Sequence, residues 1–206
     1  MNFFPVYLVC FIIFIVWLNY EQRKHEKEDQ KASDEFWARE EEANNTRKKD
    51  ISHLPLLQVN LSDIPCVDSP DEEIEYNMGR IDKIIQSPML DLSEYTNTDL
   101  KLTYGVANFN LLSEYDENYS HFLIALTNLA RAYARHGYTE TAIDTYQLAL
   151  EYGSQKVSDY KELASLFLKL EKPEAVSALI HQTERSSHPH KESVVLALRE
   201  TLVSYQ

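Results

Sequence analysis

The feature that most constrains this chain is a residue pattern that recurs after 34 positions. The matching pairs are Leu126 with Tyr160, Leu129 with Leu163, Ala130 with Ala164, and Tyr133 with Phe167. Each set occupies positions i, i+3, i+4 and i+7, which share one face of an α-helix. A fixed offset of this length is typical of stacked helix pairs, in which the small residue lets neighbouring helices approach closely.

The first copy continues into a second helix. Its turn and the matching helix face are formed by Gly137, Ala142, Tyr146 and Ala149. With these residues, 123–156 resembles a tetratricopeptide repeat, whose pattern is W-x2-L-G-x2-Y in the first helix and A-x3-F-x2-A in the second. Ser154 stands in place of the closing proline. An unrelated helical bundle remains the alternative.

The second copy, 157–189, matches well in its first helix only. Its second helix looks one residue short at the turn, which puts Ala175 and Leu179 in the alanine and aromatic places and Gln182 where the last alanine belongs. The resemblance implies an all-α domain over 73–206, a short superhelix of α-α hairpins. A C-terminal capping helix at 190–204 would close it, and 73–114 would hold a degenerate earlier repeat.

Periodicity and turn residues predict where the helices begin and end. The expected helices are 73–87, 98–114, 119–136, 139–152, 157–170, 173–185 and 190–204. The gaps between them carry Ser87-Pro88, Gly137, Gly153, Pro173 and Pro189, which are residues that end helices or form turns.

The N-terminus predicts a transmembrane anchor at 3–20, the first of three domains. Residues 3–18 carry no charged side chain, and as a helix the segment would reach about 27 Å, close to the thickness of a bilayer core. A cleaved signal peptide is the alternative, but no basic n-region or small-x-small cleavage site is present. Basic residues follow the span at Arg23, Lys24, Lys27 and Lys31, which places the N-terminus outside and the C-terminal domain in the cytoplasm.

Residues 21–72 predict a polar juxtamembrane stalk and linker. The stalk is charged and free of glycine and proline up to Asp50, so we expect a solvated helix without the heptads of a coiled coil. Phe36 and Trp37 could dock on lipid or on a partner, or the helix could fold back on its own domain. The proline-containing linker is expected to be extended, with one strand-like piece at 56–61.

Composition excludes several classes of function. The net charge is -13, so nucleic acid is not an expected partner. The two cysteines, Cys10 and Cys66, form no disulfide framework. The four glycines are scattered, so they cannot build a phosphate-binding loop. His188 and His190 flank a proline and are expected to be turn residues. We therefore expect no enzyme, and no catalytic, cofactor-binding or metal-binding residues.

What remains is a surface for a partner. In tetratricopeptide proteins the first helices of successive repeats line a concave groove, and the resemblance assigns this lining to the positions that packing leaves free. The candidate partner-binding residues are Thr127, Arg131, Arg135, Lys161, Ser165 and Lys169. Four of these six are basic, which suits an acidic peptide segment. A merely solvated helix face is the alternative, and the family's two-carboxylate clamp lacks its asparagines here.

These observations predict a membrane-tethered adaptor or scaffold that binds a protein partner at the membrane surface. A bacterial plasma membrane is favoured because the domain is short and lacks low-complexity extensions. Two alternatives keep the same architecture: an envelope chaperone or assembly factor that faces outward, and a structural subunit of a larger membrane complex.

Overall fold

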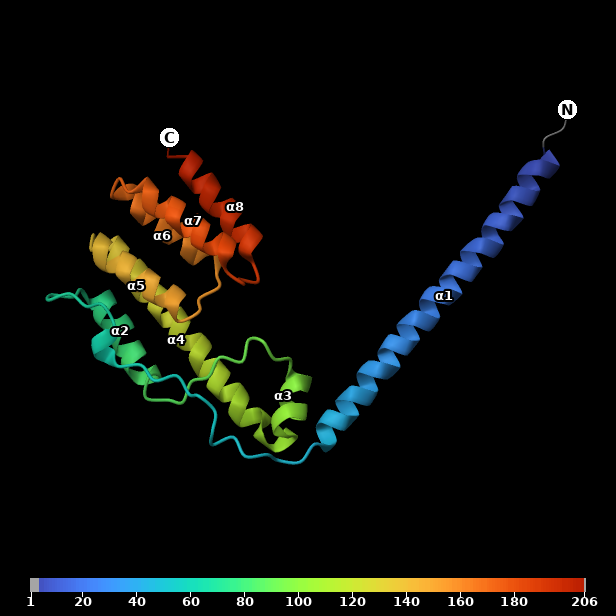
Figure 1. Cartoon of the computed structure of the whole chain (residues 1–206), viewed down its shortest axis with the longest axis horizontal. Coiled ribbons are helices and arrows are strands. Elements are labelled where there is room, and N and C mark those ends of the chain that lie inside the picture. Colours follow the sequence, from blue (N-terminus) through green and yellow to red (C-terminus); the bar gives the residue numbers. More distant parts are fainter. Residues whose placement is uncertain (1–3, 206) are drawn as a thin grey trace. The chain divides into compact units, whose positions relative to one another are not determined.

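The computed structural model describes residues 4–205, except for the side chains of residues 4–10, 12, 13, 16 and 26. The fold is all-α, as predicted, and the described residues contain no strand (Figure 1). The α-helices are α1 (Phe4–Asn45), α2 (Glu72–Ile84), α3 (Asn97–Tyr104), α4 (Phe109–Arg135), α5 (Thr139–Glu151), α6 (Val157–Lys169), α7 (Pro173–Arg185) and α8 (Lys191–Val203). Two short 3-10 helices lie at Leu61–Asp63 and Val106–Asn108.

The chain divides into two compact units. The first contains Met1–His53 and Glu94–Leu111, and the second contains Leu54–Ser93 and Leu112–Gln206. This division differs from the three domains that we predicted at 1–20, 21–72 and 73–206. The linker belongs with the repeat helices, and α3 belongs with the stalk.

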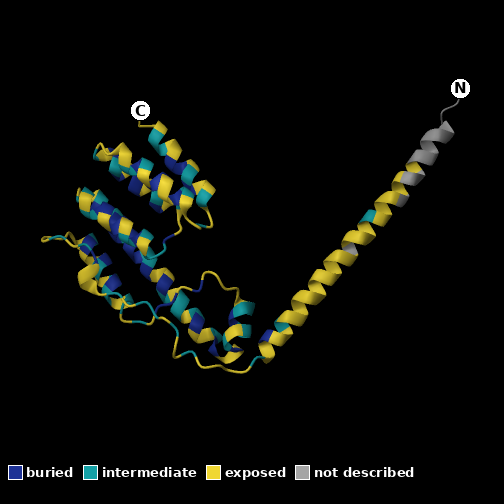
Figure 2. Ribbon diagram, in the orientation of Figure 1, coloured by how far each residue is buried: buried dark blue, intermediate teal, exposed yellow. Residues whose placement is uncertain are grey.

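In the first unit, the end of α1 is attached to α3 by charged and polar side chains. Arg39 donates to Asp99 at 2.5 Å, and Lys101 lies 3.2 Å from Glu40. Glu40 also accepts a hydrogen bond from Thr98, and these contacts hold the pKa of Glu40 below its ordinary value. The base of the stalk is therefore packed, whereas most described side chains of α1 are exposed (Figure 2).

The break after α3 depends on a close approach of two backbone segments. Gly105 has a φ of 88°, and a Cβ placed there would lie 2.2 Å from the carbonyl oxygen of Arg47. The side-chain amide of Asn108 joins the same segments, since its Nδ2 donates to the carbonyls of Lys49 and Tyr104 at 2.7 Å each. Only glycine is compatible with this conformation and this contact.

The break that we predicted between 114 and 119 is wrong, because α4 is continuous there. The predicted helices 98–114 and 119–136 left the polar residues around Asp116 and Asn118 between them. Both side chains instead bond to the preceding loop: Asp116 accepts from the backbone amide of Leu92 at 3.0 Å, and Asn118 donates to the carbonyl of Pro88 at 3.1 Å. These polar side chains form hydrogen bonds with the neighbouring loop, and the helix continues through them.

In the second unit, the helix boundaries repeat with the offset of 34. The ranges 139–151 of α5 and 173–185 of α7 differ by 34 at both ends, and so do 157–169 of α6 and 191–203 of α8. Helix α8 contacts α6 and α7, and α6 contacts α5 and α7. Thus α8 occupies the place of the first helix of a further repeat.

The patterned residues of the first copy are buried as predicted. Those with no exposed surface are Leu126, Leu129, Ala130, Tyr133, Ala142, Tyr146 and Ala149. For α7, our one-residue shift is wrong. The buried residues Val176, Ile180 and Thr183 stand 34 positions after Ala142, Tyr146 and Ala149, whereas Gln182 is exposed. The shift puts Ala175 in the alanine place, but the position that is fully buried holds the larger Val176.

The turn between α5 and α6 replaces the missing proline with polar contacts. Gly153 has a φ of 96°, and a Cβ there would lie 2.6 Å from the hydroxyl of Tyr119. That hydroxyl donates to the carbonyl of Tyr152 at 2.6 Å. Ser154 donates to the buried carboxylate of Asp159 at 2.5 Å, which fixes the start of α6.

The linker packs on the second unit without forming the strand predicted at 56–61. Leu57 donates its backbone amide to the carbonyl of Met89 at 2.8 Å, but no ladder follows within the described residues. Further along, the carbonyl of Pro65 accepts a hydrogen bond from Tyr133 at 2.8 Å, and that of Ser69 accepts one from Tyr138 at 3.3 Å. Helix α2 follows, with Ile74 and Ile81 in the core.

Much of the predicted anchor at 3–20 falls outside the described side chains. Phe3 is outside the described residues altogether. Within the part of the chain that is described, none of the helices combines the length and the apolar character needed to cross a bilayer.

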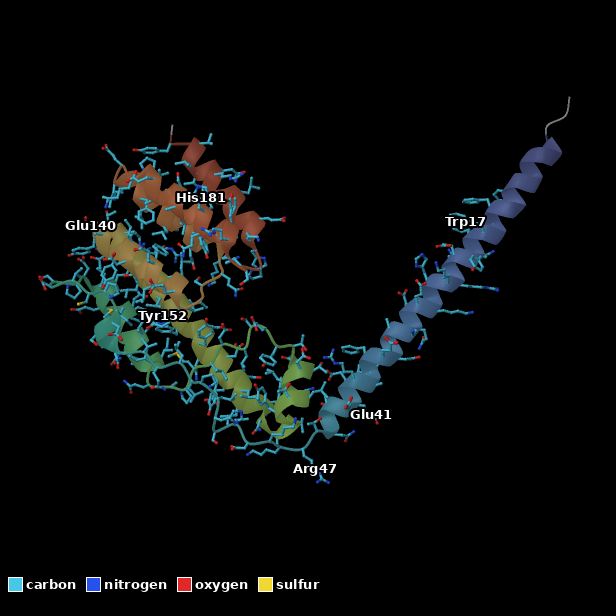
Figure 3. All side chains as sticks on the ribbon, in the orientation of Figure 1. Trp17, Glu41, Arg47, Glu140, Tyr152 and His181 are labelled. Carbon is cyan, nitrogen blue, oxygen red and sulfur yellow. The ribbon has the colours of Figure 1, made fainter. Side chains whose placement is uncertain are left out.

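We predict that Ala130→Leu destabilises the second unit by about 1 to 3 kcal/mol, because the larger side chain overpacks a fully buried helix contact. The free energy of unfolding in denaturant measures this. Glu140→Leu is the control, since Glu140 is exposed at the start of α5 and should tolerate the change (Figure 3). An unchanged midpoint for Ala130→Leu would mean that Ala130 is not at a close helix contact.

Candidate functional site

The candidate site is the groove face, which we define as the outward side of α4, α6 and α8 at positions related by the 34-residue offset. On α6 this side carries Ser158, Lys161, Glu162, Ser165 and Lys169, and all five are exposed. The buried residues of α6, such as Leu163 and Ala164, lie on its other side. The periodicity that buries one face of each helix therefore leaves the other face to solvent.

Two of the six predicted partner-binding residues are not free. Thr127 is only 4% exposed, and its hydroxyl bonds to the carbonyl of Ile124 at 3.2 Å. Arg135 is exposed, but its guanidinium forms an ion pair with Glu73 at the start of α2. Sequence periodicity could not reveal this pair, because α2 lies some sixty residues earlier in the chain.

His136 also contacts the acidic residues at the start of α2. Its Nδ1 lies 2.8 Å from Asp71 and its Nε2 lies 3.2 Å from Glu73. A neutral imidazole can donate from one nitrogen only, whereas a protonated one donates from both. The acidic start of α2 thus already supplies counter-charges to the end of α4.

Arg131 lies at a more unusual place. It is half-buried, and its guanidinium donates to Asn128 at 2.9 Å on the same helix. Beside it, Tyr146 of α5 has no exposed surface, and its hydroxyl has no hydrogen-bond partner of normal geometry among the described residues. Burial raises the pKa of Tyr146 to about 12, with the Glu162 carboxylate adding to the effect and Arg131 opposing it.

The buried hydroxyl of Tyr146 has no hydrogen-bond partner within the part of the chain that is described, and this is energetically unfavourable. Leaving a buried hydroxyl without a partner costs about 1 to 3 kcal/mol, so such groups are normally satisfied. Here the hydroxyl lies beside the guanidinium of Arg131 and near the Glu162 carboxylate of α6, at a place that solvent does not reach. Arg131 is only half-buried, so its guanidinium is the group of this pair that a charged ligand can reach.

The three predicted residues on α6 are exposed along one side of the helix. Lys161, Ser165 and Lys169 are spaced four residues apart, so they follow one another down the helix. The hydroxyl of Ser165 donates to the carbonyl of Lys161 at 2.8 Å, within the helix. The two lysines are accessible positive charges on α6.

The structure adds a third helix that we had not included. Adding 34 to Glu162, Ser165 and Lys169 gives Leu196, Arg199 and Val203 of α8, all of which are exposed. On α8 the groove face therefore gains two exposed apolar residues, Leu196 and Val203, beside the charged Arg199. Extending the repeat offset into 190–204 would have revealed these residues, but we had treated that segment only as a cap.

The histidines near the start of α8 form a turn. The backbone amide of His190 donates to Nδ1 of His188 at 3.0 Å, and the ring of His188 packs edge-on against Tyr160. Within residues 4–205, with the side-chain exceptions given above, no three His, Cys, Asp or Glu residues are placed to hold a metal ion.

Comparison with known proteins gives no match, whether to a family model, to a curated protein or to a solved structure.

We predict opposite outcomes for two buried tyrosines. Tyr119→Phe should destabilise the protein by about 1 kcal/mol, because it removes the hydrogen bond to the Tyr152 carbonyl. Tyr146→Phe should leave stability unchanged or raise it by up to about 1 to 3 kcal/mol, because it removes a buried hydroxyl without a partner. Chemical denaturation of both variants gives the comparison. A cost for Tyr146→Phe as large as that for Tyr119→Phe would show that the Tyr146 hydroxyl is already bonded within the protein.

Proposed function

We propose that this protein is a membrane-tethered adaptor whose helical repeats, of the tetratricopeptide type, bind an acidic segment of a protein partner. The observation that carries the proposal is the half-buried, positively charged Arg131 of α4. The exposed Lys161 and Lys169 supply further positive charge on the adjacent helix, within a chain whose net charge is -13. A carboxylate would find charge-assisted hydrogen bonds at this place.

The 34-residue repetition of helix ends supports the tetratricopeptide interpretation. It extends over α5 and α7 at both ends and again over α6 and α8. Stacking of such pairs produces a continuous surface made of first helices, and this kind of surface binds extended peptides. A binding protein without catalytic activity is the function that this arrangement favours, because Arg131, Tyr146 and the lysines form no nucleophile-base pair.

The proposed tether rests on the N-terminal segment of α1. The chain has sixteen uncharged residues from Phe3 to Leu18, and the described apolar side chains there, including Phe11, Phe14 and Trp17, are exposed. Exposed apolar surface of this extent calls for cover by lipid or by another protein. The basic residues that follow, Arg23 and Lys24 among them, support a cytoplasmic location for the rest of the chain under the positive-inside rule.

Tethering alone would raise the effective concentration of the binding domain near a membrane partner. A binding domain held at a bilayer meets a membrane partner at a high effective concentration, and no new contact is needed. Modest affinity in the groove would therefore be sufficient.

We predict that the double variant Lys161→Glu/Lys169→Glu loses the partner in a crosslinking pull-down, because an acidic segment would meet repulsion where it had attraction. The matched control is Lys156→Glu/Lys172→Glu, which makes the same change of charge at exposed residues before α6 and α7. Arg135 is left intact, since reversing it would also repel Glu73. Equal partner yields from the two variants would mean that the groove face is only a solvated surface and does not bind the partner.

We predict that the full chain remains in the membrane fraction after alkaline extraction, whereas a fragment lacking residues 1–20 is soluble. The physical reason is that the exposed apolar side chains that require lipid lie in this uncharged segment, so a fragment without it no longer carries them. Circular dichroism should show that the fragment stays helical. Release of the full chain by alkali would contradict the tether, and aggregation of the fragment would contradict the proposed boundary.

A further inference from the structure

The outward stripe of α8 has a composition unlike that of a helix that only closes a stack. The buried side of α8 is formed by Val194, Ala197 and Leu198. The opposite side carries Glu192, Leu196, Arg199 and Val203, at spacings of four, three and four residues. A terminal helix that merely caps a repeat array presents a polar outer face.

Two apolar residues lie in the middle and at the end of this stripe. Leu196 is 60% exposed and Val203 is 70% exposed, and Tyr205 just beyond them is exposed as well. The positions 34 residues earlier hold Glu162 and Lys169, so the apolar character is specific to α8. A surface of this kind indicates an interaction site.

The order of charges along the stripe identifies its occupant. From its N-terminal end the stripe has an acid, an apolar residue and a base: Glu192, Leu196 and Arg199. When two such helices pack antiparallel and are centred on Leu196, the leucines meet each other. Glu192 of each copy then faces Arg199 of the other, so the contact contains two such ion pairs. We propose that α8 is a self-association surface that binds a second copy of this chain through an antiparallel α8–α8 contact.

Arg199 is held ready for this contact. Its Nη2 donates to Glu184 of α7 at 2.6 Å, which orients the side chain while leaving other N–H groups of the guanidinium free. Glu192 is exposed in the first turn of α8, where the helix dipole favours a negative charge. The pairing therefore requires no change in the buried side of the helix.

The contact should be weak when the copies are dilute. A single helix pair buries less surface than a standard stable interface. Self-association should thus rise with concentration. The proposal uses none of the residues assigned to the acidic segment, so it stands or fails independently of the proposed function.

The test is a charge exchange between two differently tagged full-length copies, co-expressed and purified in a mild detergent through one tag. Copies of the natural sequence should recover each other. Two copies of Glu192→Arg, or two copies of Arg199→Glu, should show about tenfold less co-recovery, because like charges then face each other. A Glu192→Arg copy expressed with an Arg199→Glu copy should recover as well as the natural pair. One charge pair is then restored with reversed sign, and the other keeps its natural sign.

Matched controls keep the outcome specific. Glu174→Arg changes the first turn of α7 in the way that Glu192→Arg changes that of α8, and Arg185→Glu matches Arg199→Glu. Both controls should co-recover like the natural sequence. Equal recovery of every pairing would place self-association elsewhere, for example on α1. Failure of the mixed pair, or of the natural pair, would mean that the stripe does not bind a second copy and is free for a different partner. Either result overturns the proposal.

Discussion

Burial of one face of α4 is the interaction on which the rest of the second unit depends. Leu126, Leu129, Ala130 and Tyr133 are fully buried there. Removing a large apolar side chain from water contributes about 1.5 to 3 kcal/mol, but only where neighbouring helices come close enough to exclude solvent. The small side chain of Ala130 permits that approach. The polar end of Tyr133 is satisfied in the same core by the Pro65 carbonyl.

The sequence predicted the helices where local periodicity and tertiary packing agree. Helical periodicity and the turn residues located α5 to α8 within one residue at each end, because an amphipathic face and its flanking turns are local signals. The offset was misread at α7, where Val176 and Ile180 replace smaller or aromatic residues and residue type was preferred over spacing. It was also insufficient near Asp116, whose side chain bonds to a distant loop. Contacts between distant segments leave no local signal.

The same distinction holds for the candidate site. Exposure on α6 follows from helix period alone, so Lys161 and Lys169 lie where they were expected. Arg135 was also correctly placed on the surface, yet its partner Glu73 comes from an element whose position no period predicts. The unpaired hydroxyl of Tyr146 could not be predicted from sequence either, since it depends on which polar groups fail to reach it. Helix faces can be derived from the sequence, but the pairing of polar groups across them cannot.

The hydrogen bond between Tyr133 and Pro65 has a consequence for the order of folding. It joins residues 68 positions apart, whereas α5, α6, α7 and α8 contact neighbours close in sequence. Closing a long loop costs more entropy than joining adjacent helices, so the helix pairs should form first and the linker should dock afterwards. During synthesis the linker leaves the ribosome well before its docking surface on α4 exists. The segment that leads into the repeats is therefore made early and placed late, and until then it is open to proteases.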